Sequence, residues 1–479
     1  KKHEEGKKED AAYDYEEHHM LARQLEEECA VLLKNKDRIL PLHKEARVAF
    51  IGEFAVNPRY QGGGSSHINS FKVSSAAEAA KDYQITYAKG FDILRDEPDD
   101  GLIREAVEAA KEAQVAVVFA GLPDRYESEG YDRTHMNLPF CQNVLIDEIL
   151  KAQPNTVVVL HNGSPVILPW FNKVKGILEL YLGGQAVGEA TVDLLYGIAN
   201  PCGKLAETFP IKLQDNPSYL SFPGTMREVS YAEGVFIGYR YYDTKNMEVL
   251  FPFGYGLSYT TFEYSNLKMK STGNTSRDDM DLSGIIHMKD TDLLVVSLKV
   301  KNTGSSYGKE IVQLYVHDRQ ATVARPPKEL KGFEKVALAP GEEKEITFIL
   351  DKRSFAFYDT GLGDWYAETG EYDIILGRSS RDVRLSGTIV MESTVKPPFV
   401  LDDRTTLGEI LAQVKNPVEI FKPLMSSFGD TSGLDKTAGE DRMLMEMLQG
   451  LTLHSFRSFA PTAESYEQFK EEVMKQLER

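Results

Sequence analysis

Two carboxyl side chains in the stretch YESEGYDRTHMNLP (residues 126–139) are the strongest candidates for acid–base chemistry in this sequence. The run VAVVFAGL just before it is typical of a buried strand, so this charged loop begins where a strand ends. Within the loop, Glu129 is followed by a glycine and then by Tyr131, Asp132 and Arg133. A general acid needs its proton near neutral pH, which partial burial or a nearby negative charge provides. On residue chemistry alone, a solvated or salt-bridged loop without a catalytic role is the favoured interpretation.

A second loop, NPRYQGGGSSHINS, follows the predicted strand VAFIG and contains Gly62, Gly63 and Gly64. Consecutive glycines allow positive φ angles and a close approach of the backbone to a ligand. The loop has no GxxxxGK[ST] pattern, no spaced GxGxxG and no lysine to contact a phosphate, so a nucleotide site is not indicated. A tight loop without function remains the alternative.

Other catalytic patterns do not fit the sequence. Ser164, in HNGSPV, lacks the flanking glycines, two residues before and after the serine, of a GxSxG nucleophile elbow. His18 and His19 are adjacent on a predicted helix and point to different faces, and there is no HExxH or Cys/His spacing for zinc, so no metal site is expected. His161 follows a strand and is a candidate for a polar ligand contact, with a structural histidine as the equal alternative.

The candidate loops belong to a region in which apolar strands alternate with amphipathic helices up to about residue 215. The strand patterns are VAFIG, QITYAKG, VAVVFAGL, TVVVLHNG and GILELYLG, and the helical ones include EEHHMLARQLEEECAVLLKN, GLIREAVEAAKEA and EATVDLLYG. Continuous Val/Ile/Leu strands with intervening helices indicate a mainly parallel sheet covered on both faces. Ligands bind at the carboxyl ends of the strands in such sheets, where both candidate loops emerge.

From about residue 290 the pattern changes to alternation with period two, in LLVVSLKVKNTG, EIVQLYVHD, EITFILD and EYDIILGRSS. Short alternating strands separated by turn residues predict a β-sandwich. The end of the chain contains helical patterns such as ESYEQFKEEVMKQLER. We therefore predict a linker (1–20), an α/β domain with a trailing irregular segment (21–262), a β-sandwich (263–398) and a helical tail (399–479).

The amino-acid composition limits the kinds of molecule that this chain is expected to bind. The net charge of −18 over 479 residues argues against nucleic acid and against an anionic membrane surface, and it is compatible with a neutral ligand such as a sugar. No apolar run approaches the roughly 20 residues that a membrane span needs. Cys29, Cys141 and Cys202 form no CxxC pair and cannot all be paired with each other, so we expect free thiols and a reducing, cytoplasmic location.

Several long motifs, in order, resemble family 3 glycoside hydrolases of the β-glucosidase type. PRYQGGGSSHI, ESEGYDRTHMNLP and LGGQAVGEATVDLLYGIANPCGKLAETFP are similar to the second domain of that family. VLFPFGYGLSYTTFEY resembles the segment leading into the third domain, and PPKELKGFEKVALAPGEEKEITFIL resembles its fibronectin-III-like module. The resemblance covers about residues 15–395 and implies an (α/β)6 sandwich followed by a fibronectin-III-like β-sandwich.

The resemblance also implies the roles of individual residues. Glu129, in EGYDR, would be the general acid/base for hydrolysis of terminal non-reducing β-D-glycosyl residues, with Glu127 as the second candidate. Chemistry of this kind requires only carboxyls and water, and no metal or organic cofactor is implied. The residues expected to edge the sugar pocket are Arg59, Gln61, Gly63, Ser65, Ser66, His67 and Tyr131.

The sequence departs from the family in one respect that matters for the chemistry. The family's nucleophile is an aspartate in a first, TIM-like barrel domain of about 250 residues, and neither that block nor its motif occurs here; Asp364–Trp365 lies inside the predicted β-sandwich. Retaining glycosidases need two carboxyls about 5–5.5 Å apart. We therefore expect a barrel on a partner chain, either a cleaved fragment or a separate subunit, and regard a homo-oligomer as an open possibility.

Two alternatives remain. One is a non-catalytic carbohydrate-binding or structural protein that has lost the barrel. The other is a chain that hydrolyses glycosides alone with a different carboxylate. The intact EGYDR loop favours the enzyme, because a protein without catalysis has no physical need for an acidic, glycine-flanked loop at this place.

Overall fold

A computed structural model describes residues 13–273, 285–397, 399–415, 420, 449–460 and 462–477. Contacts divide the chain into two units, which are described separately: one runs to Ala356 and includes Ala367–Thr394, and the other joins Phe357–Tyr366 to residues from Val395 onward. None of the helices in these ranges is long and apolar enough to cross a membrane. Over the same ranges, no three His, Cys, Asp or Glu side chains are grouped so that they could hold a metal ion.

The α/β domain is built on a six-stranded sheet with strand order β1-β6-β5-β4-β2-β3. All neighbouring strands are parallel except β1, which pairs antiparallel with β6. The central strands are buried along their whole length, as their continuous apolar sequences predict. The strands are β1 (Val31–Asn35), β2 (Val48–Ile51), β3 (Ile85–Ala88), β4 (Val115–Gly121), β5 (Thr156–His161) and β6 (Gly176–Glu179).

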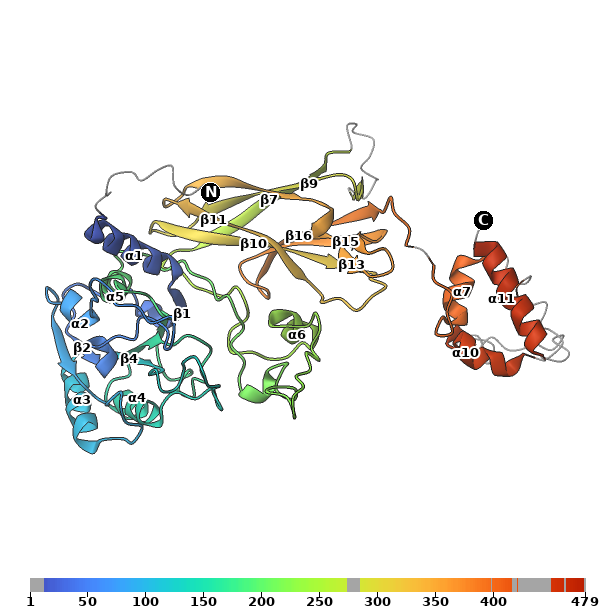
Figure 1. Cartoon of the computed structure of the whole chain (residues 1–479). Helices are drawn as coiled ribbons and strands as arrows, with labels where there is room; N and C mark the ends of the chain where they lie inside the picture. Colours follow the sequence, from blue (N-terminus) through green and yellow to red (C-terminus); the bar gives the residue numbers. More distant parts are fainter. Residues whose placement is uncertain are drawn as a thin grey trace, which may run out of the picture. The chain divides into compact units, whose positions relative to one another are not determined.

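Helices cover both faces of this sheet (Figure 1). One group packs α5 against α1 and α2, and the other pairs α3 with α4. Their bounds are α1 (Tyr15–Cys29), α2 (Ala76–Ala79), α3 (Asp100–Glu112), α4 (Phe140–Ala152) and α5 (Val187–Tyr196). The mainly parallel, two-faced α/β fold predicted from the sequence is thus confirmed.

The first predicted helix is too long, because its last residues form a strand in the structure. The helical pattern of residues 16–35 was expected to continue through AVLLKN, but α1 ends at Cys29 and the backbone of Ala30 is extended. Val31–Asn35 form the edge strand β1 instead, because pairing with β6 buries its first three side chains. Short apolar runs fit helical and strand periods equally well, so tertiary pairing decides.

The β-sandwich packs a five-stranded sheet, β11-β10-β15-β16-β8, on a three-stranded one, β12-β9-β7. Its bounds are β7 (Phe262–Ser271), β8 (Ile286–Lys289), β9 (Leu294–Asn302), β10 (Gly308–Asp318), β11 (Glu329–Leu338), β12 (Glu343–Leu350), β15 (Gly370–Gly377) and β16 (Val383–Glu392). The stretch PPKELKGFEKVALAPGEEKEI contains strand β11. A short helix, α6 (Tyr239–Thr244), precedes the sandwich.

Buried polar contacts join the sandwich to the α/β domain within the first unit. Lys204 pairs with Glu310 at 3.0 Å, and Glu310 is 1% exposed. Arg378 approaches the second oxygen of Glu310 at 3.1 Å. Gln313 donates a hydrogen bond to the carbonyl of Gly254. These contacts fix the irregular segment after the sheet against the sandwich.

The second unit contains the hairpin β13 (Phe357–Asp359) and β14 (Asp364–Tyr366) together with three described helices of the tail. These helices are α7 (Leu407–Gln413), α10 (Leu453–Phe456) and α11 (Ala463–Leu477). Their apolar core includes Ile410, Phe456 and Phe469, so the predicted helical tail has a core of its own. Residues 1–12 of the predicted linker (1–20) and most of the pattern GEDRMLMEMLQGL lie outside the described residues. The linker prediction is wrong for residues 15–20, which form the first turns of α1.

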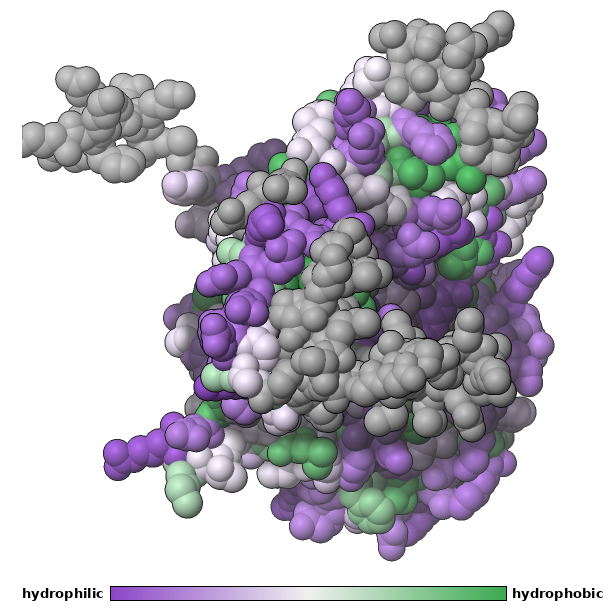
Figure 2. All heavy atoms as spheres, turned by 90° about the vertical axis from the view of Figure 1, so that its right-hand side faces the viewer, coloured by the Kyte–Doolittle hydropathy of each residue, from purple (hydrophilic) through white to green (hydrophobic). Residues whose placement is uncertain are grey.

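One face of the molecule is mainly hydrophilic among the residues that the structure describes. On the face drawn in Figure 2, charged and polar residues predominate, and hydrophobic residues form separate small patches among them. This agrees with the net charge of −18. The three cysteines are free thiols, of which Cys29 is exposed.

Candidate active site

Both candidate loops leave the carboxyl edge of the sheet, as the strand order requires. The glycine loop (residues 57–70) follows β2, and the glutamate loop (residues 122–139) follows β4. Because β2 and β4 are adjacent and parallel, the two loops emerge side by side. Residues far apart in sequence are thereby brought into direct contact.

Glu129 is held by the backbone of the glycine loop. Its backbone N–H donates to the carbonyl of Gly63 at 3.5 Å, and its carboxylate accepts a hydrogen bond from the backbone N–H of Ser65. Gly64 adopts φ +91°, and a Cβ at this position would lie 2.6 Å from the Cβ of Glu129. The glycines are therefore required by the close approach of a protein side chain, and the predicted tight loop has a defined partner.

The carboxyl of Glu129 is exposed at the rim of the sheet. Hydrogen bonding from the side chain and the backbone N–H of Ser65 lowers the pKa of Glu129 below its ordinary value. The group is therefore an exposed carboxylate, oriented on one side and open on the other. This arrangement can accept a proton from water or a ligand, and it becomes a proton donor only if its surroundings change.

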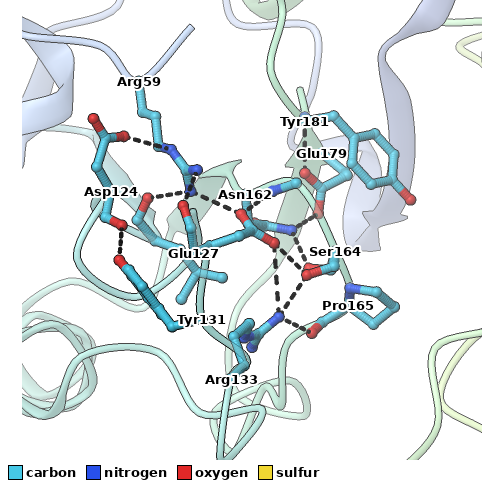
Figure 3. Close-up of polar contacts among 12 residues, drawn as sticks. Arg59, Asp124, Glu127, Tyr131, Arg133, Asn162, Ser164, Pro165, Glu179 and Tyr181 are labelled. Carbon is cyan, nitrogen blue, oxygen red and sulfur yellow. Dashed lines mark hydrogen bonds and ion pairs between the residues drawn. The ribbon is translucent and has the colours of Figure 1, made fainter. Parts of the chain in front are cut away.

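Glu127, two residues earlier, has a different environment (Figure 3). One carboxylate oxygen accepts from Nη1 of Arg59 and from the backbone N–H of Gly163, both at 2.7 Å. The other oxygen accepts from the hydroxyl of Ser164 and lies 3.9 Å from Nη1 of Arg133. We call these five residues the Glu127 cluster. Every oxygen of Glu127 is engaged, and the cluster ties the loops after β2, β4 and β5 together.

Arg59 is the buried cation of this cluster, with its side chain 5% exposed. Its guanidinium also donates to the backbone carbonyls of Leu122 and Glu127, at 2.7 and 2.8 Å, and its Nε lies 3.2 Å from a carboxylate oxygen of Asp124. Tyr131 secures the other end of the same turn, because its hydroxyl donates to the carbonyl of Asp124 at 2.6 Å. Arg59 and Tyr131 thus hold the glutamate loop in place.

A cavity of about 300 Å³ lies beside the two loops. Of the residues predicted to edge the sugar pocket, Arg59, Gln61 and His67 line it. The amide of Gln61 is fixed by Ile68, whose backbone N–H donates to its oxygen at 3.0 Å. Gly63 and Ser65 contact the Glu129 region, and Ser66 is exposed on the same loop. The predicted residues therefore occupy two neighbouring places at one edge of the sheet.

His161 is a core residue and not part of the rim. Its side chain is 1% exposed and its ring lies against those of Phe54 and Phe119. Burial lowers the pKa of His161 to about 4, so the ring is neutral. Of the two readings that the sequence left open, the structural one applies, but the hydrogen bonding expected with it is not found, since neither ring nitrogen has a partner among the described residues.

Two parts of the chain match the models of known domain families. Residues 30–259 match the model of the glycosyl hydrolase family 3 C-terminal domain, and residues 310–380 match the fibronectin type III-like domain. The chain carries the family 3 C-terminal domain. The glycine loop, the glutamate loop and the Glu127 cluster all lie within the matched residues of that domain.

Similar proteins include several glycosidases. The thermostable beta-glucosidase B of Acetivibrio thermocellus is 49% identical over 476 residues, covering 98% of this chain and 61% of that protein. An exo-alpha-(1->6)-L-arabinopyranosidase of Bifidobacterium breve is 42% identical over 410 residues, 83% of this chain and 52% of that protein. The crystal structure of the family 3 beta-glucosidase of Bifidobacterium adolescentis matches with a TM-score of 0.78 and 42% identity, covering 86% of this chain and 58% of that one. This chain therefore spans between half and two thirds of the length of these relatives.

Sequence reasoning missed the partners of Glu127 in this family 3 domain. Ser164 had been considered only as a nucleophile, whereas its hydroxyl donates to Glu127. Arg133 had been noted only as a neighbour of Glu129, and it donates to the hydroxyl of Ser164 at 2.6 Å. The signal that could have pointed to them is that each lies in a loop that follows a predicted parallel strand, since such loops meet at one edge of the sheet.

Proposed function

We propose that this chain supplies the acid/base half of a retaining β-glycosidase, with Glu129 as the general acid/base. The enzyme would remove terminal non-reducing β-D-glycosyl residues, as the β-glucosidase relatives suggest. A TIM-like barrel on a partner chain would supply the aspartate nucleophile. In the first step Glu129 gives its proton to the leaving oxygen while the aspartate attacks the anomeric carbon, and in the second step Glu129 activates the water that releases the sugar.

The observation that carries the proposal is the contrast between the two glutamates. Glu127 has both oxygens bound within its cluster and faces the buried guanidinium of Arg59. Glu129 is exposed and is held only from the side of the glycine loop. A catalytic acid must reach the substrate, and Glu129 is the one of the two that can do so without breaking other contacts.

The pKa of Glu129 supports the requirement for a second body. A general acid needs a raised pKa, whereas hydrogen bonding from Ser65 lowers the pKa of Glu129 in this chain. A docked barrel would remove water from the carboxyl and bring a second carboxylate to about 5–5.5 Å. Both changes raise a carboxyl pKa. The chain alone holds the acid in position, and we assign its activation to the barrel.

In this proposal the barrel also determines the sugar specificity. The relatives include beta-glucosidases and an arabinopyranosidase, although all align with this chain over the same domain. Residues of the α/β domain that line the cavity beside the two loops, such as Gln61 and His67, would contact the outer side of the sugar.

Complementation tests the proposal directly. The chain is assayed on an aryl β-glucoside alone, mixed with a family 3 barrel expressed separately, and mixed with the same barrel as the Glu129→Gln variant. We expect turnover by the unmodified chain mixed with the barrel, none by the chain alone, and much slower turnover by the Glu129→Gln mixture. Turnover by the chain alone, or unchanged turnover in the variant mixture, would contradict the proposal. Saccharide binding without turnover in a stable complex would favour the non-catalytic alternative.

A further inference from the structure

A second cavity, of about 380 Å³, lies beside the Glu127 cluster. Arg133 and Ser164 of the cluster form one of its walls. The segment after the sheet and the irregular chain before α6 form the others. The further polar residues of the lining are His135, Glu207, Thr208, Asn216, Ser218, Glu233 and Tyr242.

Three buried polar atoms of this lining lack a hydrogen-bond partner within the part of the chain that the structure describes. They are Nη2 of Arg133, the hydroxyl of Thr208 and one carboxylate oxygen of Glu233. Thr208 is only 6% exposed. Buried polar atoms are almost always hydrogen-bonded in native proteins, so three around one cavity indicate a partner that fits inside it.

The charges and the walls of the cavity select the kind of partner. The two acids, Glu207 and Glu233, disfavour an anionic ligand, and Arg133 disfavours a cationic one. Met136 and Ile237 add apolar surface suited to the C–H face of a ring. A neutral molecule with several hydroxyl groups can both donate to carboxylates and accept from a guanidinium. The volume lies in the range of sites for small ligands.

The carboxyl of Glu207 is suited to binding ligand hydroxyl groups both as a hydrogen-bond donor and as an acceptor. The hydroxyl of Tyr181 donates to one of its oxygens at 3.2 Å. Burial raises the pKa of Glu207 to about 7, with the nearby charge of Glu127 acting in the same direction and that of Arg133 in the opposite one. Near neutral pH this carboxyl exists in both protonation states and can donate or accept.

We propose that this cavity is a second binding site, separate from the candidate active site, for an uncharged, hydroxyl-rich molecule of about monosaccharide size. Arg133 connects it to the Glu127 cluster, because its Nη1 binds Ser164 and approaches Glu127, and its buried Nη2 has no hydrogen-bond partner among the described residues. A bound ligand would therefore stabilise the Glu127 cluster. An effect on catalysis rests on the proposed function, whereas binding itself does not.

Isothermal titration of the chain with D-glucose, glycerol and sodium glucuronate tests this site. For a ligand of this size we expect a glucose Kd on the order of 1 mM, with weaker binding of glycerol and of the anionic glucuronate. Thr208→Val, which removes one unpartnered hydroxyl without changing the size of the side chain, should weaken glucose binding about tenfold. Ile237→Trp, at a rim position that is 53% exposed, should block the cavity without disturbing the core.

Gly64→Ala is the matched control, because it disturbs the contact with Glu129 and leaves this cavity untouched. Its glucose affinity should equal that of the unmodified chain. Loss of binding in Gly64→Ala but not in Thr208→Val or Ile237→Trp would place the sugar at the candidate active site and overturn the proposal. Absence of binding for both glucose and glycerol would overturn it as well. Because Ile237→Trp alters only the rim, it decides the question if Thr208→Val fails to fold.

Discussion

Replacing Glu127 by Gln should destabilise the α/β domain, although Glu127 lies only two residues from the proposed acid. The change keeps the size of the side chain and removes its charge. Nη1 of Arg59 and the N–H of Gly163 would then donate to a neutral amide oxygen, and the new amide would face the hydroxyl of Ser164. That hydroxyl already accepts a hydrogen bond from Arg133, so the N–H donors of the new amide would compete with Arg133 for it.

The size of the effect follows from these contacts. Hydrogen bonds to charged groups contribute about 1.5–3 kcal/mol, against about 0.5–1.5 for neutral ones. Loss of the charge from the bonds to Arg59 and Ser164 therefore costs about 2–3 kcal/mol. Asp124, 3.2 Å from the Arg59 guanidinium, keeps the cost below the roughly 3–5 kcal/mol of a fully broken buried pair. In a domain of this size, a shift of about 2–4 °C per kcal/mol gives a Tm lower by about 4–12 °C.

Thermal unfolding followed by circular dichroism measures this change, with Glu129→Gln as the matched control. The side chain of Glu129 is exposed and makes its contacts through Ser65, so its replacement should leave Tm unchanged. Equal Tm values for Glu127→Gln and the unmodified chain would refute the structural role of the Glu127 cluster. A larger loss in Glu129→Gln would reverse the assignment of the two glutamates.

Two further outcomes test the surroundings of these glutamates. Gly64→Ala should displace Glu129 and lower kcat of the barrel-complemented enzyme about 10²-fold. Gly62→Ala, whose Cβ would meet only the flexible side chain of a serine, should retain activity. Equal losses in the two variants would contradict the contact between Gly64 and Glu129. Burial raises the pKa of Glu207 from 4.5 to about 7, so the folded chain keeps a proton that the unfolded chain has lost between these values. The free energy of unfolding should therefore fall by up to about 3 kcal/mol as pH rises through this window and level off above it; urea unfolding of Glu207→Gln should lack this part of the slope, and an identical slope would contradict the burial of that carboxyl.

The fold could be predicted wherever local patterns are unambiguous. The strands that became β4 and β5 are continuous apolar runs between turn signals, and only a doubly covered parallel sheet accommodates them. β1 could not be distinguished from the end of α1, because VLLKN satisfies both periods and its pairing with β6 is a long-range event. Such pairing is invisible in the sequence of either segment.

The candidate site shows the same division. The position of the glutamate loop at the carboxyl edge follows from the order of strands and helices. The different environments of Glu127 and Glu129 do not, because Arg59 and Gly163 approach Glu127 from loops 68 and 36 residues away. Sequence alone offered two carboxyls of the same type in one loop. Only the contacts distinguish the one that is fixed from the one that is exposed.

The leaving-group dependence of Glu129→Gln in the barrel-complemented enzyme tests the central claim most directly. Turnover of an alkyl β-glucoside, which needs protonation of its leaving oxygen, should fall by about 10²–10⁴-fold. Formation of the glycosyl-enzyme from a dinitrophenyl β-glucoside should fall far less, because that leaving group departs without a proton. Equal loss on both substrates, or the same pattern in Glu127→Gln, would contradict the role of Glu129 as the proton donor.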